Sequence, residues 1–458
     1  MKRLSAILAA GTLQLTACST QPAGPPPAAL PAAWSAEAGA AVGDTTHWWR
    51  NFQDPQLDTL VDRALLTNND FAAAAIRVRR AQLQAALVDT NPVPSVSANA
   101  FSAVAQGYDP KFTARTSGLS SLLSFEVDLW GKLDSQRQAS RSEAEATVAD
   151  CRAFAASLVG TTAKLYWQLG TLNQLLAMAD ADIEYARRTL QLARTKFEVG
   201  SISKLNAAEA ELSLSTQQAA RTQLVQQRAE AHNALAILFN QPPQAPVSEL
   251  STLPEGRLPA VGAGLPAEIL ANRPDLQAAE LRVRESLANV DVVRTSFYPT
   301  LTLTGSLGTS SGSLVRFLQS PIGTVGGDLA LPFVQWRTAK LTTRIAQTQY
   351  EEAAVGFRQR LYTALAEVEN ALSARAQLQA EEQTLRIAVE QARLAESIAR
   401  TRFEAGASDV QLWLDAQQRV RGLERSLVYN RLNQFDTQAD LYRALGLGVE
   451  SDRVHCGA

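Results

Sequence analysis

The chain has 458 residues, a formal net charge of −2 and only 19% charged residues, so it lacks the basic excess that a nucleic-acid partner would require. Its three cysteines and three histidines are scattered, which argues against a disulfide framework, a metal site or any other bound cofactor. The sequence contains no Ser/His/Asp set and no phosphate-binding loop, so no catalytic residues are expected.

The first residues are typical of a secretory signal. Two basic residues precede an apolar run that is too short to span a bilayer, so residues 1–17 are predicted to be a signal peptide. The letters LTAC at residues 15–18 resemble a bacterial lipobox, in which the cysteine, here Cys18, is acylated. An ordinary signal peptide with a chance cysteine is the alternative. Residues 18–43 are predicted to form a Pro-rich flexible tether, and by resemblance to other lipoproteins Ser19 favours the outer membrane.

Residues 44–243 are predicted to form a first structural repeat. Helical periodicity starts at Pro55 and runs to about residue 90. Apolar and polar side chains then alternate at residues 95–104 and 123–130, which predicts two strands with one apolar face each. These lengths are close to the roughly ten residues that a tilted strand needs to cross a bilayer.

Long helices follow the strands. From residue 131 to about 199, apolar residues recur at steps of three and four, which predicts a coiled-coil helix of roughly 100 Å. A returning helix at residues 204–239 is its expected partner. The two short helices of the repeat together hold about as many residues as the long one, so end to end they can match its length.

A Pro/Gly-rich linker at residues 244–264 leads to a second repeat at residues 265–448. The same elements recur in the same order: a short helix at 266–296, strands at 300–307 and 327–333, a long helix at 338–405 and a return helix from about 408 to 446. Residues 449–458 are expected to be a frayed tail. Cys151 is interpreted as a small core residue of the first long helix, and the pairing of Cys456 in the tail is left open.

The two long helices end in a duplicated turn. The letters RTKFEVG at residues 194–200 return as RTRFEAG at residues 400–406, and Trp336 matches Trp130 at the same offset. In both copies the helical pattern ends at a glycine, the residue that tolerates the left-handed conformation past a helix end. Each long helix is therefore predicted to form an antiparallel hairpin with the helix after it.

Two strands per repeat give four per chain, too few to close a membrane barrel, because an unpaired edge in lipid leaves backbone groups without partners. If the strands enter a membrane, the chain must oligomerise, and three copies would supply twelve strands. The expected fold class is mainly α with a membrane β-barrel segment, built from long antiparallel coiled-coil hairpins plus four strands per chain.

The duplicated turn, the lipobox and the strand pairs together resemble the TolC-like outer-membrane factor family, in particular the lipoproteins of the NodT-like branch. The resemblance extends from about Trp48 to Gly448. It implies a homotrimeric duct in which a twelve-stranded β-barrel stands on a twelve-helix α-barrel with an iris-like closure. It also implies two protein partners, a periplasmic adaptor (membrane fusion protein) and an inner-membrane pump of RND type. It further implies that the protein catalyses no reaction.

The expected function is therefore the outer-membrane exit duct of a tripartite efflux pump for small molecules and drugs. Such a protein is not an enzyme; it is lipid-anchored in the outer membrane and extends far into the periplasm. A similar duct for type I protein secretion is the closest alternative. A structural periplasmic coiled-coil lipoprotein would explain the heptads, but neither the four strands nor the duplication.

The resemblance also assigns roles to the tips of the hairpins. The tip residues are small and lightly charged, so the helical hairpin of an adaptor can pack closely on them, whereas the simpler interpretation is that they are only good turns. The predicted docking residues are Gly200, Ser201, Ile202, Ser203, Lys204 and Leu205 in the first tip and Gly406, Ala407 and Ser408 in the second.

A gate is expected just past the second tip. Asp415 lies where the family's constriction carboxylates lie, and three copies around an axis would select cations. A solvated aspartate on a helix face is the alternative. The second acid of the best-known two-carboxylate iris is replaced here by Leu412, so a ring of Leu412 beside a ring of Asp415 is the predicted gate. Asp409 is a weaker candidate for the same opening.

Overall fold

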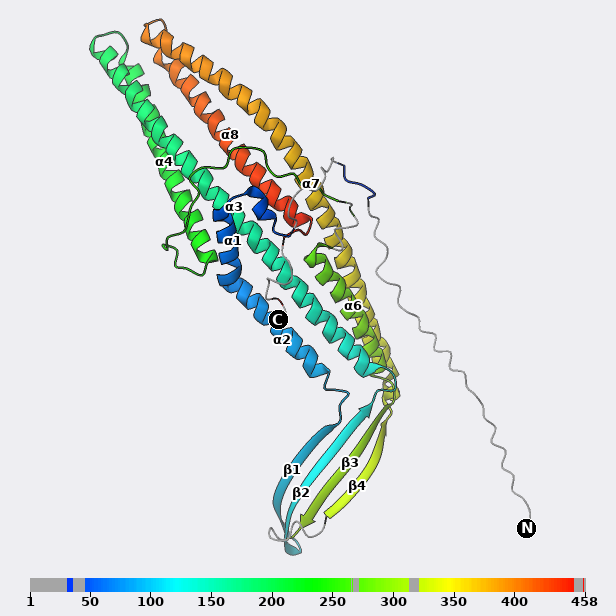
Figure 1. The fold of residues 1–458 in the computed structure, drawn as a ribbon. Helices are drawn as coiled ribbons and strands as arrows, with labels where there is room; N and C mark the ends of the chain where they lie inside the picture. Colours follow the sequence, from blue (N-terminus) through cyan, green and yellow to red (C-terminus); the bar gives the residue numbers. More distant parts are fainter. Residues whose placement is uncertain are drawn as a thin grey trace, which may run out of the picture.

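The structure, a computed structural model, describes residues 31–35, 46–264, 266, 272–312, 321–448 and 456. The predictions for the signal peptide, for Cys18 and for most of the tether fall outside these residues. The described chain is a long bundle of helices, with four strands projecting from one end and two hairpin tips at the other (Figure 1). Among the described helices, none combines the length and the apolar character needed to cross a membrane.

The first repeat begins with a short 3-10 helix, η1 (Trp48–Phe52), followed by α1 (Pro55–Thr67) and α2 (Asn69–Val88). The prediction of one uninterrupted helix here is wrong, because the backbone at Asn68 is extended. The Asn68 side chain accepts a hydrogen bond from the Phe71 backbone N–H at 2.9 Å. This residue therefore ends α1 and caps α2, as asparagine commonly does at a helix start.

The two long helices are α3 (Lys132–Glu198) and α7 (Trp336–Glu404), with 67 and 69 residues. At 1.5 Å per residue each is about 100 Å long. Each turns back into a helix of 35 residues, α4 (Lys204–Leu238) after α3 and α8 (Val410–Ala444) after α7. The predicted pair of antiparallel hairpins is confirmed, with bounds within a few residues of those expected.

Two junctions join shorter helices end to end. Asn68 Nδ2 donates a hydrogen bond to the carbonyl of Leu238, the last residue of α4, at 3.0 Å. In the second repeat Arg273 precedes α6 (Pro274–Thr295) and donates to the carbonyl of Ala444, the last residue of α8, at 3.3 Å. The predicted end-to-end arrangement is confirmed for α2 with α4, whereas α1 lies beside the end of α4 (Figure 1). The start of α6 at Pro274 is later than predicted, at a proline that suits a first helical turn.

The four strands form one antiparallel sheet in the order β1-β2-β3-β4. Their bounds are Ser95–Tyr108 for β1, Lys111–Val127 for β2, Thr300–Ser311 for β3 and Pro321–Ala330 for β4. β2 and β4 begin earlier and end earlier than predicted, and a short 3-10 helix, η3 (Pro332–Gln335), replaces the end predicted for β4. The early parts of both strands are rich in Ser, Thr and Gly and show no clear alternation, so their pairing with neighbouring strands is what reveals them.

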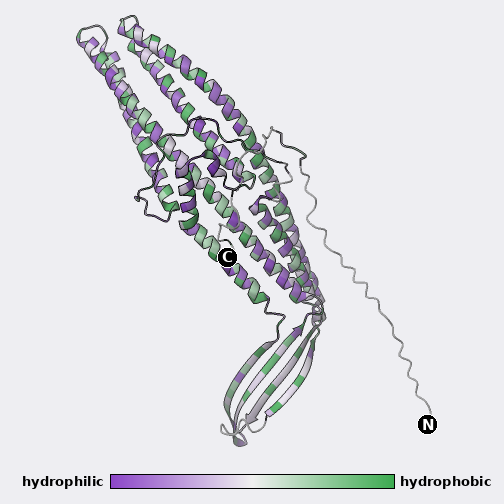
Figure 2. Cartoon of the chain, viewed as in Figure 1, coloured by the Kyte–Doolittle hydropathy of each residue, from purple (hydrophilic) through white to green (hydrophobic). Residues whose placement is uncertain are grey.

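The strand register gathers most of the large apolar side chains on one face of the sheet. One face carries the large apolar residues Val96, Leu119, Leu123, Phe125, Leu301, Leu303, Leu307, Val325 and Leu329. The other face carries mainly Ser, Thr, Gly and Asn, with Glu126 and Asp328 near the helices, but it also holds four exposed large apolar residues, Phe101, Phe112, Leu122 and Ile322. Figure 2 shows the alternation as bands along the strands. β1 and β4 are the edges, and neither pairs with a further strand in the described part of the chain.

The main core lies at mid-height of the bundle and takes side chains from both repeats. Trp48 and Trp49 are buried there, and Trp48 stacks on Tyr442 of α8 with ring centroids 4.9 Å apart. Trp167 of α3 packs against Phe435 of α8 at the same centroid distance. This aromatic cluster joins the lower half of α8 to α3, because it contributes large apolar contacts between them.

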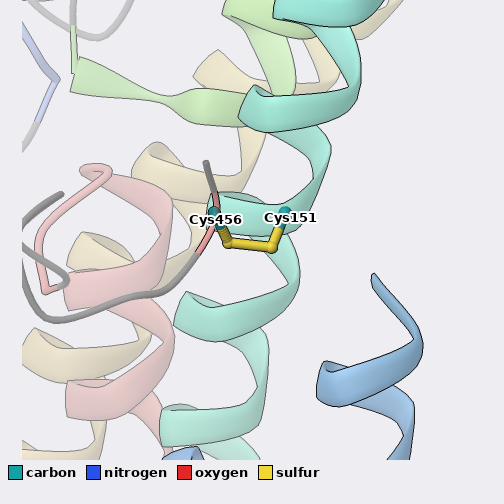
Figure 3. Close-up of a disulfide and its surroundings, with 2 residues drawn as sticks. All are labelled: Cys151 and Cys456. Carbon is teal, nitrogen blue, oxygen red and sulfur yellow. A yellow bond between two sulfur atoms is a disulfide. The ribbon is translucent and has the colours of Figure 1, made fainter. Parts of the chain in front are cut away.

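Cys151 of α3 and Cys456 form a disulfide that attaches the C-terminal segment to the bundle (Figure 3). Two expectations are thereby corrected: Cys151 is cross-linked rather than a free core residue, and the tail is held at Cys456 rather than frayed there. Both cysteines are buried. The partners are 305 residues apart in the sequence, and no spacing rule connects cysteines at such a distance.

Candidate functional site

Both hairpin tips are built as the same glycine turn. Gly200 and Gly406 have φ angles of +73° and +74°, the left-handed conformation that glycine adopts without steric cost. The Gly200 N–H donates to the Phe197 carbonyl at 2.9 Å, and the next N–H donates to the Lys196 carbonyl at 2.8 Å. The second tip repeats both bonds at 3.0 and 2.8 Å. The two helices thus end in the same type of C-cap, as the duplicated sequence predicted.

The residues predicted to receive an adaptor lie on the outer surface of these tips. Ser203 begins α4 with a capping box, in which the Ser203 N–H donates to Asn206 Oδ1 at 3.1 Å and the Asn206 N–H donates back to Ser203 Oγ at 3.4 Å. Seven of the predicted residues are exposed: Gly200, Ser201, Ser203, Lys204, Leu205, Gly406 and Ala407. Ile202 and Ser408 are half-buried beneath them.

The two tips are bound to each other. Asn206 Nδ2 of the first hairpin donates to Asp409 Oδ1 of the second. Lys196 Nζ donates to the carbonyls of Phe403 and Glu404 at 3.1 Å each, and its ammonium lies 5.2 Å from the Phe403 ring centroid. A cation at the carboxyl end of α7 suits the negative end of the helix dipole. The tips therefore present one joint surface rather than two independent turns.

The predicted gate residues lie at the start of α8. Leu412 is exposed on the first turn of α8. Asp415 is half-buried, and its Oδ1 accepts a hydrogen bond from Gln411 Nε2 at 2.7 Å. It lines a groove of about 430 Å³ between α4 and α8. Asp409 is directed to Asn206 instead, so the structure brings Leu412 and Asp415 together and gives Asp409 a role in joining the tips.

Below the tips, polar side chains connect the two hairpins, and the sequence did not single out any of them. Glu396 Oε1 of α7 accepts a hydrogen bond from Tyr185 Oη of the first hairpin at 2.5 Å and another from Trp413 Nε1 of its own hairpin at 2.6 Å. Burial and the neighbouring Glu396 raise the pKa of Tyr185 to about 12. Further along, Gln417 Nε2 of α8 donates to Thr189 Oγ1 of α3 at 3.3 Å, with both residues buried.

One turn farther from the tips, charged residues join α3 to α8. Arg425 Nη2 lies 3.4 Å from Asp182 Oδ2, and Arg421 is buried close to the same carboxylate. Burial raises the pKa of Asp182, although Arg421 and Arg425 oppose the shift. Burial also lowers the pKa of Arg421, against the attraction of Asp182. In the sequence these residues resemble ordinary solvated positions of a helix, and only the placement of α8 beside α3 shows that they meet.

Within the described residues, no group of three or more His, Cys, Asp or Glu side chains is arranged to hold a metal ion. The geometry of the tips instead offers an exposed protein surface above a layer of polar links. Residues 60–241 and residues 265–447 each match the outer membrane efflux protein family, and the two matches coincide with the two structural repeats. The chain belongs to the outer membrane efflux protein family.

Full-length relatives support this membership. Pyoverdine export outer membrane protein OpmQ of Pseudomonas putida is 30% identical over 96% of this chain and 97% of its own length. Toxin and drug export protein A of Aggregatibacter actinomycetemcomitans is 27% identical over 87% of this chain and 88% of its own length. Among solved structures, the outer-membrane channel OprN superposes with a TM-score of 0.83 and 25% identity, over 92% of this chain and 98% of OprN.

The expected resemblance to TolC-like outer-membrane factors is thereby confirmed. The outer membrane efflux proteins are channels of the outer membrane, not enzymes, and this chain shares their mainly helical fold with a small sheet. The family match also accounts for the duplication, because it covers the chain in two separate stretches of similar length.

Proposed function

We propose that this outer membrane efflux protein is the homotrimeric exit duct of a tripartite pump. It passes small molecules from a periplasmic adaptor and an inner-membrane transporter of RND type to the exterior. The observation that carries the proposal is the sheet with one mainly apolar face and two unpaired edges, continuous with helices of about 100 Å. An apolar outer face and a polar inner face suit a strand between lipid and a water-filled lumen.

The unpaired edges support three copies. β1 and β4 have 14 and 10 residues, and each presents free backbone groups along one side of the sheet in the described chain. Such groups cost several kcal/mol each in lipid, so a membrane sheet must close. A threefold ring that joins β1 of one copy to β4 of the next closes both edges and gives twelve strands.

Aromatic side chains support the placement of the sheet in the membrane. Near the helices, Trp130 packs edge-on against Tyr298 with ring centroids 5.4 Å apart. Trp336 is exposed at the same end of the sheet. Tyr108 is exposed at the far end of β1. From Val96 to Tyr108 the strand runs for about 40 Å, or about 30 Å across a membrane at a tilt near 40°. This span fits the hydrocarbon thickness, with aromatic residues at both interfaces.

The gate proposal rests on the exposed Leu412 and the neighbouring Asp415. Rings of three leucines and three aspartates near the axis would close the periplasmic end by dewetting and by charge. The polar links between α3 and α8 would hold the hairpins together in a closed form, and water can replace such hydrogen bonds at low net cost. Channel currents in a planar bilayer should rise for Leu412→Ala and for Asp415→Ala, and unchanged conductance and ion selectivity would refute the assignment.

The tips are the proposed docking surface for the adaptor. The exposed residues of the predicted docking set are mostly small and include only one charged side chain, Lys204, which permits close approach of another helical hairpin. The joint surface formed by Asn206 and Asp409 gives that hairpin a fixed target.

The proposed lipid anchor at Cys18 fits the contacts of the segment that follows it. Trp34 Nε1 donates to the Gly264 carbonyl at 3.0 Å, and the Ser35 N–H donates to Glu369 Oε1 at 2.9 Å. Glu369 lies about 50 Å along α7 from the sheet. The chain between Cys18 and Trp34 can span at most about 55 Å, so an acyl group on Cys18 can reach the membrane. Labelling with fatty acid should be lost in Cys18→Ser, and labelling that persists would disprove the anchor.

A duct for type I protein secretion is the second candidate, because one relative is named a toxin and drug export protein. Crosslinking the tips in cells and identifying the partner that copurifies distinguishes the efflux function from the secretion function. Recovery of an adaptor of an RND pump, with higher drug susceptibility in a deletion strain, is the expected result. Recovery of a protein-export apparatus with unchanged drug tolerance would overturn the efflux function.

A further inference from the structure

Two helix faces are exposed in the protomer although their counterparts in the other repeat are buried. On α7, Ile345 and Val355 are 58% and 60% exposed. At the offset that relates Trp130 to Trp336, they correspond to Ala139 and Ala149 of α3, which are 6% and 4% exposed. The same positions of the repeat are thus covered on α3 and open on α7.

The helix α2 shows the same difference at the other side of the protomer. Ile76 and Leu83 are 63% and 65% exposed. At the offset that relates Arg77 to Arg282, they correspond to Leu281 and Ala288 of α6. Leu281 packs on a cluster of alanines, and Ala288 is 9% exposed. The open face of α2 therefore has a covered equivalent on α6.

Two of these equivalents, Ala149 and Leu281, lie in the contact where α3 packs on α6. Ala146 and Ala149 of α3 form a buried cluster with Ala278 of α6. We infer that α7 of one copy packs on α2 of the next copy in the way that α3 packs on α6 within the protomer. This inference rests on the homotrimer proposed above, and it names the surfaces that meet: the seam formed by Ile345 and Val355 of one copy against Ile76 and Leu83 of the other.

The template also identifies an ion pair across the seam. Inside the protomer, Arg282 Nη2 lies 2.6 Å from Asp150 Oδ2, and its Nε lies 3.2 Å from Glu143 Oε2. Arg282 therefore spans the helix turns on either side of Ala146. At the seam, Arg77 takes the place of Arg282 and Glu352 takes the place of Ala146.

The two acids that hold Arg282 have no acidic counterparts on α7, where Gln349 and Gly356 stand instead. Arg77 at the seam thus lacks both partners of its equivalent, and Glu352 supplies a carboxylate between their positions. Arg77 and Glu352 are exposed, and neither forms an ion pair in the part of the protomer that the structure describes. The Arg77–Glu352 pair fixes the register of one copy on the next, because each charge would be buried without a partner in any other register.

Neighbouring charges provide matched controls. Arg79 corresponds to Arg284, which is exposed on α6 and pairs with Glu280 of its own helix at 2.6 Å. Glu351 corresponds to Glu145, which is exposed on α3. Both control residues therefore lie outside the seam, although Glu351 is next to Glu352 and Arg79 is two residues from Arg77.

Charge reversal tests the pair. The intact protein is extracted in mild detergent, and the trimer fraction is measured by native mass spectrometry. Arg77→Glu and Glu352→Arg should each lose most of the trimer, and the double variant should recover it. The control variants Arg79→Glu and Glu351→Arg should keep it. Single variants with a full trimer fraction, or a double variant without recovery, would overturn the pair.

Cysteine crosslinking tests the seam without charge changes that could impair folding. Ala73 and Val355 correspond to Ala278 and Ala149, so cysteines at both positions should link copies into a covalent ladder that ends at three in intact cells. Cysteines at the control positions Arg79 and Glu351 should not crosslink. A wild-type chain that is monomeric would contradict the homotrimer itself. A wild-type trimer without the Ala73–Val355 crosslink would overturn the seam alone.

Discussion

Replacing Asp436 by Asn is expected to stabilise the protein at neutral pH and to have little effect in acid. Asp436 lies on α8 beside Lys164 and Asp440, and its Oδ1 atom is buried without a hydrogen-bond partner in the described structure. Burial raises the pKa of Asp436 from 3.8 to about 6; Lys164 opposes the shift and Asp440 adds to it. A buried carboxylate without sufficient partners is costly, and protonation relieves that cost.

The sign and size follow from proton linkage. The folded state binds this proton more tightly than the unfolded state, so its contribution to stability is complete below about pH 4 and is lost as the pH rises through 6. With 1.36 kcal/mol for each pH unit between the two pKa values, the charged Asp436 costs about 3 kcal/mol per protomer at pH 8. Asn has nearly the same shape and stays neutral, so Asp436→Asn should recover up to about that amount at pH 8.

The assay is thermal unfolding of the purified protein by circular dichroism between pH 4.5 and 8. The midpoint of Asp436→Asn minus that of the wild type should be positive at pH 8 and should shrink below pH 6. Asp180→Asn is the control, because the exposed Asp180 pairs with Arg221 at 2.5 Å between the side-chain oxygen and nitrogen, and its loss should lower the midpoint only slightly. A difference that does not depend on pH, or a lower midpoint of Asp436→Asn at pH 8, would refute the reasoning.

Three further changes test the tips, the tail and the polar layer. Gly406→Ala should lose about 1 to 2 kcal/mol of stability in the same unfolding assay, because φ at this residue is +74°, whereas Gly422→Ala inside α8 should gain up to about 1 kcal/mol. Cys456→Ser should lower stability by about 2 to 5 kcal/mol, and a reductant should destabilise the wild type but not this variant. Glu396→Gln should raise the channel current more than Tyr185→Phe, because Glu396 accepts both the bond from Tyr185 of the first hairpin and the bond from Trp413 within the second, whereas Tyr185 donates only one.

Periodic patterns made most of the fold predictable. The apolar steps of α3 and the glycines at positions 200 and 406 gave the two hairpins nearly to the residue, because each depends on local helix geometry. The break at Asn68 was missed because its side chain both caps α2 and meets the end of α4, a contact with a residue far along the chain. The Ser- and Thr-rich beginning of β2 was missed because only strand pairing identifies it.

The candidate site was predictable only in part. The resemblance to TolC-like proteins assigned the roles of Leu412, Asp415 and the tip residues, and it could do so because their positions beside a turn are visible in the sequence. The contact of Asn206 with Asp409 depends on how one hairpin lies beside the other, and the disulfide of Cys151 depends on where the tail meets α3. Contacts between elements remote in sequence leave no periodic trace, so they required the structure.

The central claim is that three copies close one continuous duct, and electron cryo-microscopy of the full-length protein in lipid nanodiscs tests it most directly. We expect a particle with threefold symmetry in which β1 of each copy pairs with β4 of the next. We also expect the lumen to continue between the long hairpins and to narrow at Leu412 and Asp415. A monomeric or dimeric particle, or three copies whose sheet edges stay apart, would contradict the proposed duct.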